Sequence, residues 1–300
     1  MLCGLLIIFG LATDHFASAL TFRTLANQLP DALLLATGLT LVIAAGGIDL
    51  SVGSVLALSG AVGGVALAQW GWPLPLAGAA AVAAGLGCGL LNGGVTVRWT
   101  LPSFLVTLAM LEMARGGAYL VTGSQTVYLG VAVDVVNQPL LFGLRAPFLV
   151  AVATVCATEV LLRQTVFGRQ VLAVGSNPDG ARLAGIDPGR VRLATFAFAG
   201  ACAGLAAVMQ STRLAAADPN AGIGAELDAI AAVVIGGTSL SGGRGSALMS
   251  CLGVAVMAVL GGGLAQAGVQ EPTRRLVTGA VIVGAAIVDH YRRRAHPRLV

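Results

Sequence analysis

The residues of this chain that could do chemistry are few and widely spaced. Glu226 and Asp228 are the closest pair of carboxylates of interest, and they flank the start of a short apolar segment rather than face each other across a cleft. The three histidines, His15, His290 and His296, lie at segment ends or in the tail, where interfacial positions are expected. No lysine occurs, which excludes a phosphate-binding Gly-x-x-x-x-Gly-Lys-Ser/Thr loop. We therefore expect no catalytic residues, no metal and no cofactor in this chain.

The composition is that of a protein embedded in a membrane. Hydrophobic residues make up 57% of the 300 positions and charged residues only 10%, whereas soluble globular proteins carry about 25% charged residues. The 42 glycines suit helices that pack closely through small side chains. The five cysteines lie in apolar runs without metal-ligand spacing, so we expect small buried side chains. The net charge of +4 comes from arginines at segment ends, so nucleic acid is not an expected partner.

Charge-free stretches predict about ten transmembrane segments, some of them short and broken by glycine. They cover residues 1–13, 32–48, two segments within 50–97 divided near 70–75, and then 101–121, 146–162, 193–212, 229–243, 246–266 and 276–288. The first is short for a span of about 20 residues, and we expect a polar cytoplasmic leader ahead of it. The expected fold class is all-α, with residues 1–300 forming a single transmembrane domain.

Arginine is distributed unevenly between the two sides of this arrangement. The polar loop 163–192, Arg98, Arg244 and the arginines of the tail fall on one side, whereas the loops 131–144 and 215–227 on the other side contain none. The positive-inside rule places the arginine-rich side, and both termini with it, in the cytoplasm. Arg274 and Arg275 are exceptions to this rule.

The longest polar interruption, residues 164–192, contains the signals of a short helix. Asn177 suits the N-cap, Pro178 the first helical position and Gly185 the stop, which predicts a helix over roughly 178–184. A capped helix on the most basic loop offers a docking point to a cytoplasmic partner.

Two glycine-rich segments are similar to each other. Residues 46–53 align without gaps with residues 236–243, and each follows a short run rich in Val and Ile. Short, glycine-interrupted segments in corresponding places indicate a binding or gating region in transporters. The alternative is that two ordinary glycine turns are alike by chance.

Few ionisable residues lie near the apolar segments. Glu112 and Arg115 are three residues apart and are expected to pair on one helix face. Glu159 is expected to reach toward Arg163, and Asp49 stands at the break between two spans. Carriers driven by a proton or sodium gradient bury several such groups along their path, so a gradient-driven carrier is an under-equipped alternative.

Three blocks of the sequence carry a family resemblance. They read GGIDLSVGS from residue 46, GRQVLAVGSNPDGARLAGI from residue 168 and ELDAIAAVVIGGTSLSGG from residue 226. In order and spacing, over nearly the whole chain, they resemble the membrane permease subunit of bacterial ABC importers of the ribose/monosaccharide family, with a type II-like fold. The first block and Val-Gly-Ser-Asn-Pro favour the sugar branch over the autoinducer-2, nucleoside and branched-chain amino acid permeases, which stay open as alternatives. A membrane-embedded enzyme is disfavoured because no catalytic constellation is present.

The resemblance implies an assembly in the bacterial inner membrane. Two permease subunits, identical or different, would surround a central path, and a periplasmic solute-binding protein would deliver the sugar to the outer face. A separate cytoplasmic ATP-binding subunit, which would hold ATP and Mg²⁺, would dock at the coupling helix. The positions that match the coupling region here are Gly175, Asn177, Pro178, Ala181, Gly185 and Ile186.

The path is expected to be sparse and weakly polar, because the binding protein selects the substrate. Broken segments expose backbone groups that are tolerated only beside protein or water. We therefore expect the path or its cytoplasmic gate to be lined by Asp49, Ser51, Asn92, Gln125, Gly237, Thr238 and Ser239. The alternative for each polar residue is a hydrogen bond between helices.

Overall fold

The computed structural model describes residues 1–13, 16 and 18–295. His15, His296 and Arg298 lie outside the described residues, and so does the side chain of His290. The described chain is mostly helical, as expected, with four short strands in its loops. Its elements are α1 (Leu2–Ala12), α2 (Ala19–Gln28), α3 (Pro30–Ala44), α4 (Val52–Ala68), α5 (Leu74–Arg98), α6 (Ser103–Thr122), β1 (Val127–Tyr128), η1 (Gly130–Val133), α7 (Asp134–Asn137), β2 (Pro139–Leu141), β3 (Leu144–Arg145), α8 (Ala146–Gln164), α9 (Val166–Ser176), α10 (Pro178–Leu183), α11 (Pro188–Leu214), β4 (Ala216–Ala217), α12 (Ala225–Ile235), α13 (Ala247–Gln266) and α14 (Glu271–Ala295).

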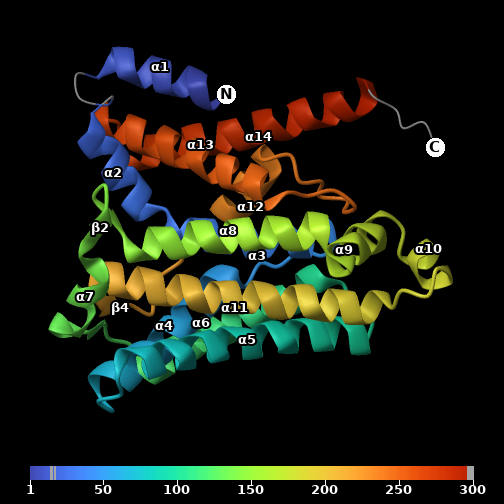
Figure 1. Ribbon diagram of the computed structural model, residues 1–300, viewed down its shortest axis with the longest axis horizontal. Coiled ribbons are helices and arrows are strands. Elements are labelled where there is room, and N and C mark those ends of the chain that lie inside the picture. Colours follow the sequence, from blue (N-terminus) through green and yellow to red (C-terminus); the bar gives the residue numbers. More distant parts are fainter. Residues whose placement is uncertain (14–15, 17, 296–300) are drawn as a thin grey trace.

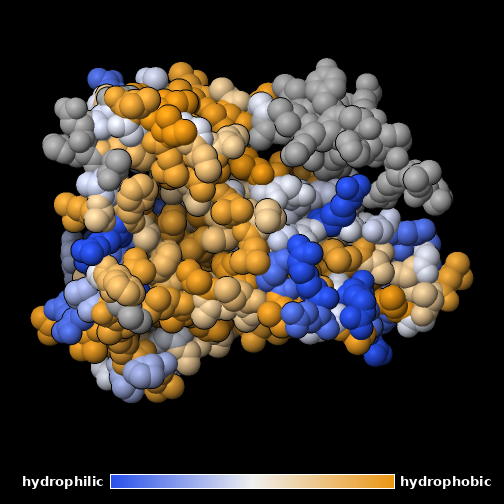
Figure 2. Space-filling view, turned by 45° about the horizontal axis from the view of Figure 1, so that its top comes forward, coloured by the Kyte–Doolittle hydropathy of each residue, from blue (hydrophilic) through white to orange (hydrophobic). Residues whose placement is uncertain are grey.

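The long helices lie side by side along one axis of the molecule, and the loops gather at its two ends (Figure 1). One end holds α9 and α10, and the other holds α7 and the short strands, in which β1 pairs with β4 and β2 with β3. In Figure 2 an apolar surface covers the middle of the visible face, and hydrophilic residues gather toward the ends. This distribution is the one that a bilayer requires of helices that cross it.

The structure does not confirm ten spans. Among the described residues, five helices are long and apolar enough to cross a membrane: α5, α6, α8, α11 and α13. The pair α2 and α3 makes a sixth if it is one span bent by 51° at its break. The apolar helices Leu2–Leu11 and Val52–Ala68 are shorter. The count falls because several apolar runs form helices that are too short to cross about 30 Å of hydrocarbon.

Helix α3 is the centre of the packing. Every residue from Leu33 to Ala44 is buried, and α3 packs against α8, α11, α12 and α13. Beside it, α5 and α11 approach closely through small residues, because a side-chain carbon at Gly85 would meet the backbone of Gly200 and Gly204. The glycine content therefore serves close helix packing, as the composition predicts.

Two helices of ten residues or more are not expected from the sequence. The sequence of α2 is too polar to predict a membrane segment. Ser18 caps the start of α2 by accepting a hydrogen bond from the Thr21 N–H at 3.1 Å, and Pro30 begins α3 shortly after its end. Proline cannot donate the backbone hydrogen bond that a continuous helix needs, which accounts for the bend. Helix α9 occupies the first half of the polar loop, where Thr165 caps it at 3.2 Å.

Two expectations about side chains need correction. Arg115 does not pair with Glu112 among the described contacts; it donates to the carbonyl oxygens of Pro219 and Ala221 at 2.6 and 2.7 Å. This places the guanidinium on the loop between β4 and α12. Only two cysteines are buried, Cys88 and Cys202, and Cys251 is half-buried; Cys3 and Cys156 are exposed, since they lie on outward helix faces. The two exceptional arginines, Arg274 and Arg275, both pair with Glu271.

Candidate functional site

The capped helix in the polar loop is present. The Asn177 side chain accepts hydrogen bonds from the backbone N–H groups of Asp179 and Gly180 at 3.1 and 2.9 Å, and Pro178 begins α10. Gly185 follows the helix with φ +79°, a left-handed conformation that favours glycine. These local signals confirm the predicted helix to within one residue at its end. In Figure 1, α10 is the most projecting element at its end of the molecule.

The two faces of α10 differ in character. Ala181 is 6% exposed and packs inward against Val174 and Val191, so this residue seats the helix on the chain itself. The outward face carries an ion pair between Asp179 and Arg182 at 3.2 Å. Beside it Leu183 is 91% exposed. Sequence reasoning missed Leu183, although a lone leucine within a polar loop is the signal that could have found it.

The other family-matched positions of the loop take internal positions. Ile186 is half-buried, and its N–H donates to the carbonyl of Ala181 at 2.9 Å, which closes the end of α10. Gly175 stands near the end of α9, where a side-chain carbon would overlap the carbonyl oxygen of Ala44 and lie 2.5 Å from the N–H nitrogen of Gly243. Only glycine fits there.

The three sequence blocks meet at this point, which we call the glycine junction: Ala44, Gly46, Gly175, Gly242 and Gly243. The Gly243 N–H donates to the Ala44 carbonyl at 2.9 Å, which joins the two glycine-rich segments directly. Gly175 packs between them, and α10 begins three residues later. The end of α9, which leads directly into α10, is therefore in contact with both broken segments.

The first broken segment is held by a buried polar network. The Asp49 side chain is 2% exposed, and its Oδ1 accepts from the N–H and the hydroxyl of Ser51 at 2.8 and 2.6 Å. Asn92 of α5 donates to the Ser51 hydroxyl at 2.9 Å. Helix α6 binds the neighbouring backbone, because the hydroxyls of Ser103 and Thr107 accept from the N–H groups of residues 48 and 50. The structure thus brings together three of the predicted path residues, Asp49, Ser51 and Asn92.

The second broken segment has a different geometry from the first. Gly46 has φ +80° in the first, whereas in the second Gly237, which aligns with residue 47, has φ +87°. The segment is also longer, since Gly242 and Gly243 have positive φ and α13 begins only at Ala247. The two are related segments and not copies of one turn. The extra length is what lets the second segment reach the junction.

The remaining predicted path residues are divided between the two ends. Thr238 and Ser239 are buried, and the Ser239 hydroxyl bonds that of Ser241 at 3.1 Å. The hydroxyl of Thr238 is buried without a partner among the described residues. Gln125 is exposed in the loop after α6, at the end opposite α10, so it is not brought together with the others.

The Glu159 carboxylate makes more hydrogen bonds than the sequence predicts. It pairs with Arg163, as predicted, but it is 7% exposed and also accepts from the Ser246 hydroxyl at 3.0 Å and the Leu248 N–H at 3.3 Å. A carboxylate from α8 therefore caps the first turn of α13, where the helix dipole favours a negative charge. This bond fixes the end of the second broken segment.

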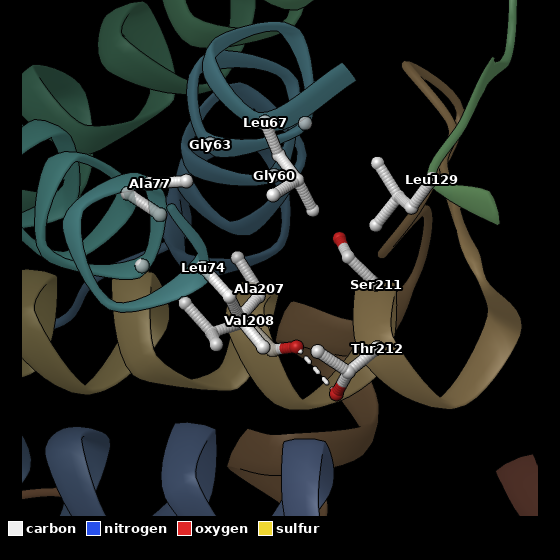
Figure 3. Close-up of a pocket in the computed structure, with 13 residues that line it drawn as sticks. Gly60, Gly63, Leu67, Leu74, Ala77, Leu129, Ala207, Val208, Ser211 and Thr212 are labelled. Carbon is white, nitrogen blue, oxygen red and sulfur yellow. Dashed lines mark hydrogen bonds between the residues drawn. The ribbon is translucent and has the colours of Figure 1, made fainter. Parts of the chain in front are cut away.

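A small pocket between α4, α5 and α11 is shown in Figure 3. It has a volume of about 20 Å³ and is lined by Gly60, Gly63, Ala77 and Ser211 among others. The Thr212 hydroxyl beside it is turned to the Val208 carbonyl at 2.9 Å. A volume of this size holds about one water molecule, so the pocket is no site for a solute. Among the described residues, no group of three or more His, Cys, Asp and Glu could hold a metal ion.

The chain matches known proteins along nearly its whole length. Residues 21–286 match the model of a family described as branched-chain amino acid transport system / permease component. The chain is 33% identical to the ribose import permease protein of Escherichia coli (strain K12), covering 97% of this chain and 93% of that protein. It is 36% identical to the ribose import permease protein of Bacillus subtilis (strain 168), with 95% and 89% covered. It is 31% identical to the fructose import permease protein of Rhizobium meliloti, with 96% and 83% covered. No solved structure matches the chain.

Proposed function

Because the chain belongs to the family of branched-chain amino acid transport system / permease components, we propose that it is the permease subunit of an ATP-driven monosaccharide importer. The proteins to which the chain is similar include import permeases for ribose and fructose. These names support a sugar rather than an amino acid as the solute. The monosaccharide reading agrees with the sugar-type blocks of the sequence.

The glycine junction is the observation that carries this proposal. A partner that moves α10 also moves Gly175, and Gly175 cannot shift without displacing the carbonyl of Ala44 or the N–H of Gly243. Packed backbones without intervening side chains transmit displacement, because no flexible group absorbs it. The energy of ATP hydrolysis would therefore reach both broken segments from a separate ATPase subunit that binds the outward face of α10.

The partners follow from this arrangement. The ATPase subunit would hold ATP and Mg²⁺ at the cytoplasmic end, and a solute-binding protein would dock at the end with α7 and the strands. A second permease subunit would complete the path. The shorter helices α1, α4 and α12 would finish the membrane domain, with residues 164–192 as the coupling loop and both termini in the cytoplasm of a bacterial inner membrane. We place the path or gate at Asp49, Ser51, Asn92, Gly237, Thr238 and Ser239, and leave Gln125 at the outer end.

The test is reconstitution of the chain with its ATPase and its solute-binding protein in liposomes. We expect uptake of at least one labelled monosaccharide that requires ATP and the binding protein. A sodium or proton gradient without ATP should drive no uptake. Uptake of leucine in place of every sugar tested, or uptake driven by an ion gradient alone, would contradict the proposal.

A further inference from the structure

A larger cavity lies apart from the glycine junction, between α3, α11, α12, α13 and α14. Its volume is about 350 Å³, within the range of about 300–1,000 Å³ that holds small molecules. Its polar lining consists of Gln28, Asp31, Gln210, Asp228 and Thr278. Leucines from α3 and α4 and Met257 of α13 supply an apolar wall. The lining therefore combines a few polar groups with apolar surface, as small-molecule sites do.

Asp31 is the best-defined polar group of this cavity. Its Oδ2 accepts from the Gln210 amide and from the Arg213 guanidinium, both at 2.9 Å. Its Oδ1 is buried and has no partner among the described residues. A buried acceptor without a partner costs about 1–3 kcal/mol. This oxygen has almost no exposed surface in the structure, so a hydroxyl group of a bound solute would satisfy it after a small shift of the neighbouring side chains.

The length of α12 indicates how far the cavity lies from the membrane surface. This helix has 11 residues, about 16 Å at 1.5 Å per residue, which is about half of the hydrocarbon thickness. Its last residue, Ile235, precedes the second broken segment, which reaches the glycine junction. We therefore expect its first turn, with Ala225 and Asp228, to lie about half-way through the bilayer. Just before it, Gly222 packs against Gly53 at the start of α4. In transporters built from broken helices, the solute binds where such half-helices begin.

A second cavity continues from the first toward the outer end. It has a volume of about 270 Å³ and is lined by Thr21, Thr24, Gln28 and Gln266 among others. Gln28 lines both cavities, and Gly261 of the first is followed in sequence by Gly262 of the second. Together they describe a partly polar route between α2 and α13 that leads to Asp31.

The charge of the lining selects among solutes. None of the lining residues of the larger cavity is a cation. Two guanidinium groups lie near it and both are paired: that of Arg213 with Asp31 and that of Arg275 with Glu271. Asp228 adds a further carboxylate to the wall. A solute with a carboxylate or phosphate would meet no counter-charge, whereas hydroxyl groups can donate to both carboxylates and accept from the Gln28 amide.

We propose that this cavity is a binding site for a neutral, hydroxyl-rich solute on the translocation route, held by Asp31, Asp228 and Gln28. The proposal rests on the proposed function, and it adds the place and the chemistry of the site. It also accounts for two carboxylates and two glutamines that the coupling machinery does not use.

The test uses the reconstituted importer with labelled ribose, xylose, fructose and 2-deoxyribose. Gln28→Leu removes one hydrogen-bonding group, and we expect about a tenfold loss of uptake at low sugar concentration, as for one hydrogen bond of about 1.4 kcal/mol. Ala258→Phe fills the cavity and should abolish uptake while the permease still binds its ATPase. The control, Gln69→Leu, changes the same type of side chain on an exposed position after α4 and should leave uptake within twofold.

A selectivity measurement separates a binding role from a structural one. The binding protein is the same in all samples, so a change in the uptake ratio of ribose to 2-deoxyribose in Gln28→Leu reports the permease, and a merely unstable variant lowers both equally. Suppose that the wild type imports a sugar. If both cavity variants then import it normally, or if Gln28→Leu leaves the uptake ratio of ribose to 2-deoxyribose unchanged, the cavity is not the site and the proposed function stands. If the wild type imports no sugar, the proposed function fails and the sugar site with it.

Discussion

The backbone N–H of Gly243 donates to the carbonyl oxygen of Ala44 at 2.9 Å, although 199 positions separate the two residues in the chain (243 − 44). This bond joins the ends of two broken membrane segments. Gly175 packs on the same carbonyl from the polar loop, so the bond is also the place where the segment just before α10 reaches α3.

Gly175→Ala should uncouple ATP hydrolysis from uptake. The added methyl group overlaps the Ala44 carbonyl, and relief of such overpacking costs about 1–3 kcal/mol and moves the backbone. We expect about a tenfold fall in sugar taken up per ATP hydrolysed, measured in liposomes at matched protein amounts. Gly94→Ala is the control, since a side-chain carbon there meets nothing within 4 Å. If Gly175→Ala takes up as much sugar per ATP hydrolysed as the wild type, the glycine junction does not couple ATP hydrolysis to transport.

Leu183→Glu should release the ATPase subunit. Leu183 is the exposed apolar side chain of α10, and an aliphatic side chain that fills a pocket at the centre of an interface can anchor binding. Burying an unpaired carboxylate in its place costs several kcal/mol, so co-purification of the ATPase with the tagged permease should fall more than tenfold. Val131→Glu, which changes an aliphatic side chain that is 82% exposed at the opposite end, should have no effect. Full retention of the ATPase by Leu183→Glu would place the docking surface elsewhere.

Glu159→Gln should lower thermal stability. The substitution keeps the size of the side chain but weakens the bonds to Ser246 and Leu248 and removes the ion pair with Arg163. A hydrogen bond to a charged group contributes about 1.5–3 kcal/mol, so the melting temperature in detergent should fall by a few degrees. Glu112→Gln is the matched control, because Glu112 is exposed on α6. Equal melting temperatures for the two variants would rule out the capping role.

The orientation predicts a labelling pattern. In a background without native cysteines, Val131→Cys should react with a membrane-impermeant thiol reagent applied to intact cells. Ala184→Cys, which is exposed just after α10, should react only after the membrane is opened. The reverse labelling pattern would mean that the membrane topology is inverted, and α10 could then not bind a cytoplasmic ATPase.

What could be predicted from the sequence was mostly local. The cap at Asn177 and the stop at Gly185 depend on neighbours within four residues, so α10 was predicted to within one residue of its end. Helix α9 was missed because its polar residues look like loop when read along the chain, although they lie on one side of an amphipathic helix.

The distant relationships could not be predicted. Nothing near Gly175 in the sequence indicates that Ala44 and Gly243 lie against it, and nothing near Asp31 indicates Gln210 and Arg213. The expected pair of Glu112 and Arg115 failed for the same reason: spacing along a helix could not foresee the carbonyls of residues 219 and 221, which a loop brings to the guanidinium.

The burial of α3 has a consequence for how the protein moves. Its first turn is tied to α11 through Asp31 and Arg213 at 2.9 Å, and its last residue is tied to the second broken segment through Ala44. With both ends tied to neighbouring segments and every residue from 33 to 44 buried, we expect α3 to stay folded while the helices around it move. Its amide protons should then exchange with deuterated solvent more slowly than those of α14, and ATP turnover should speed exchange around it without speeding its own.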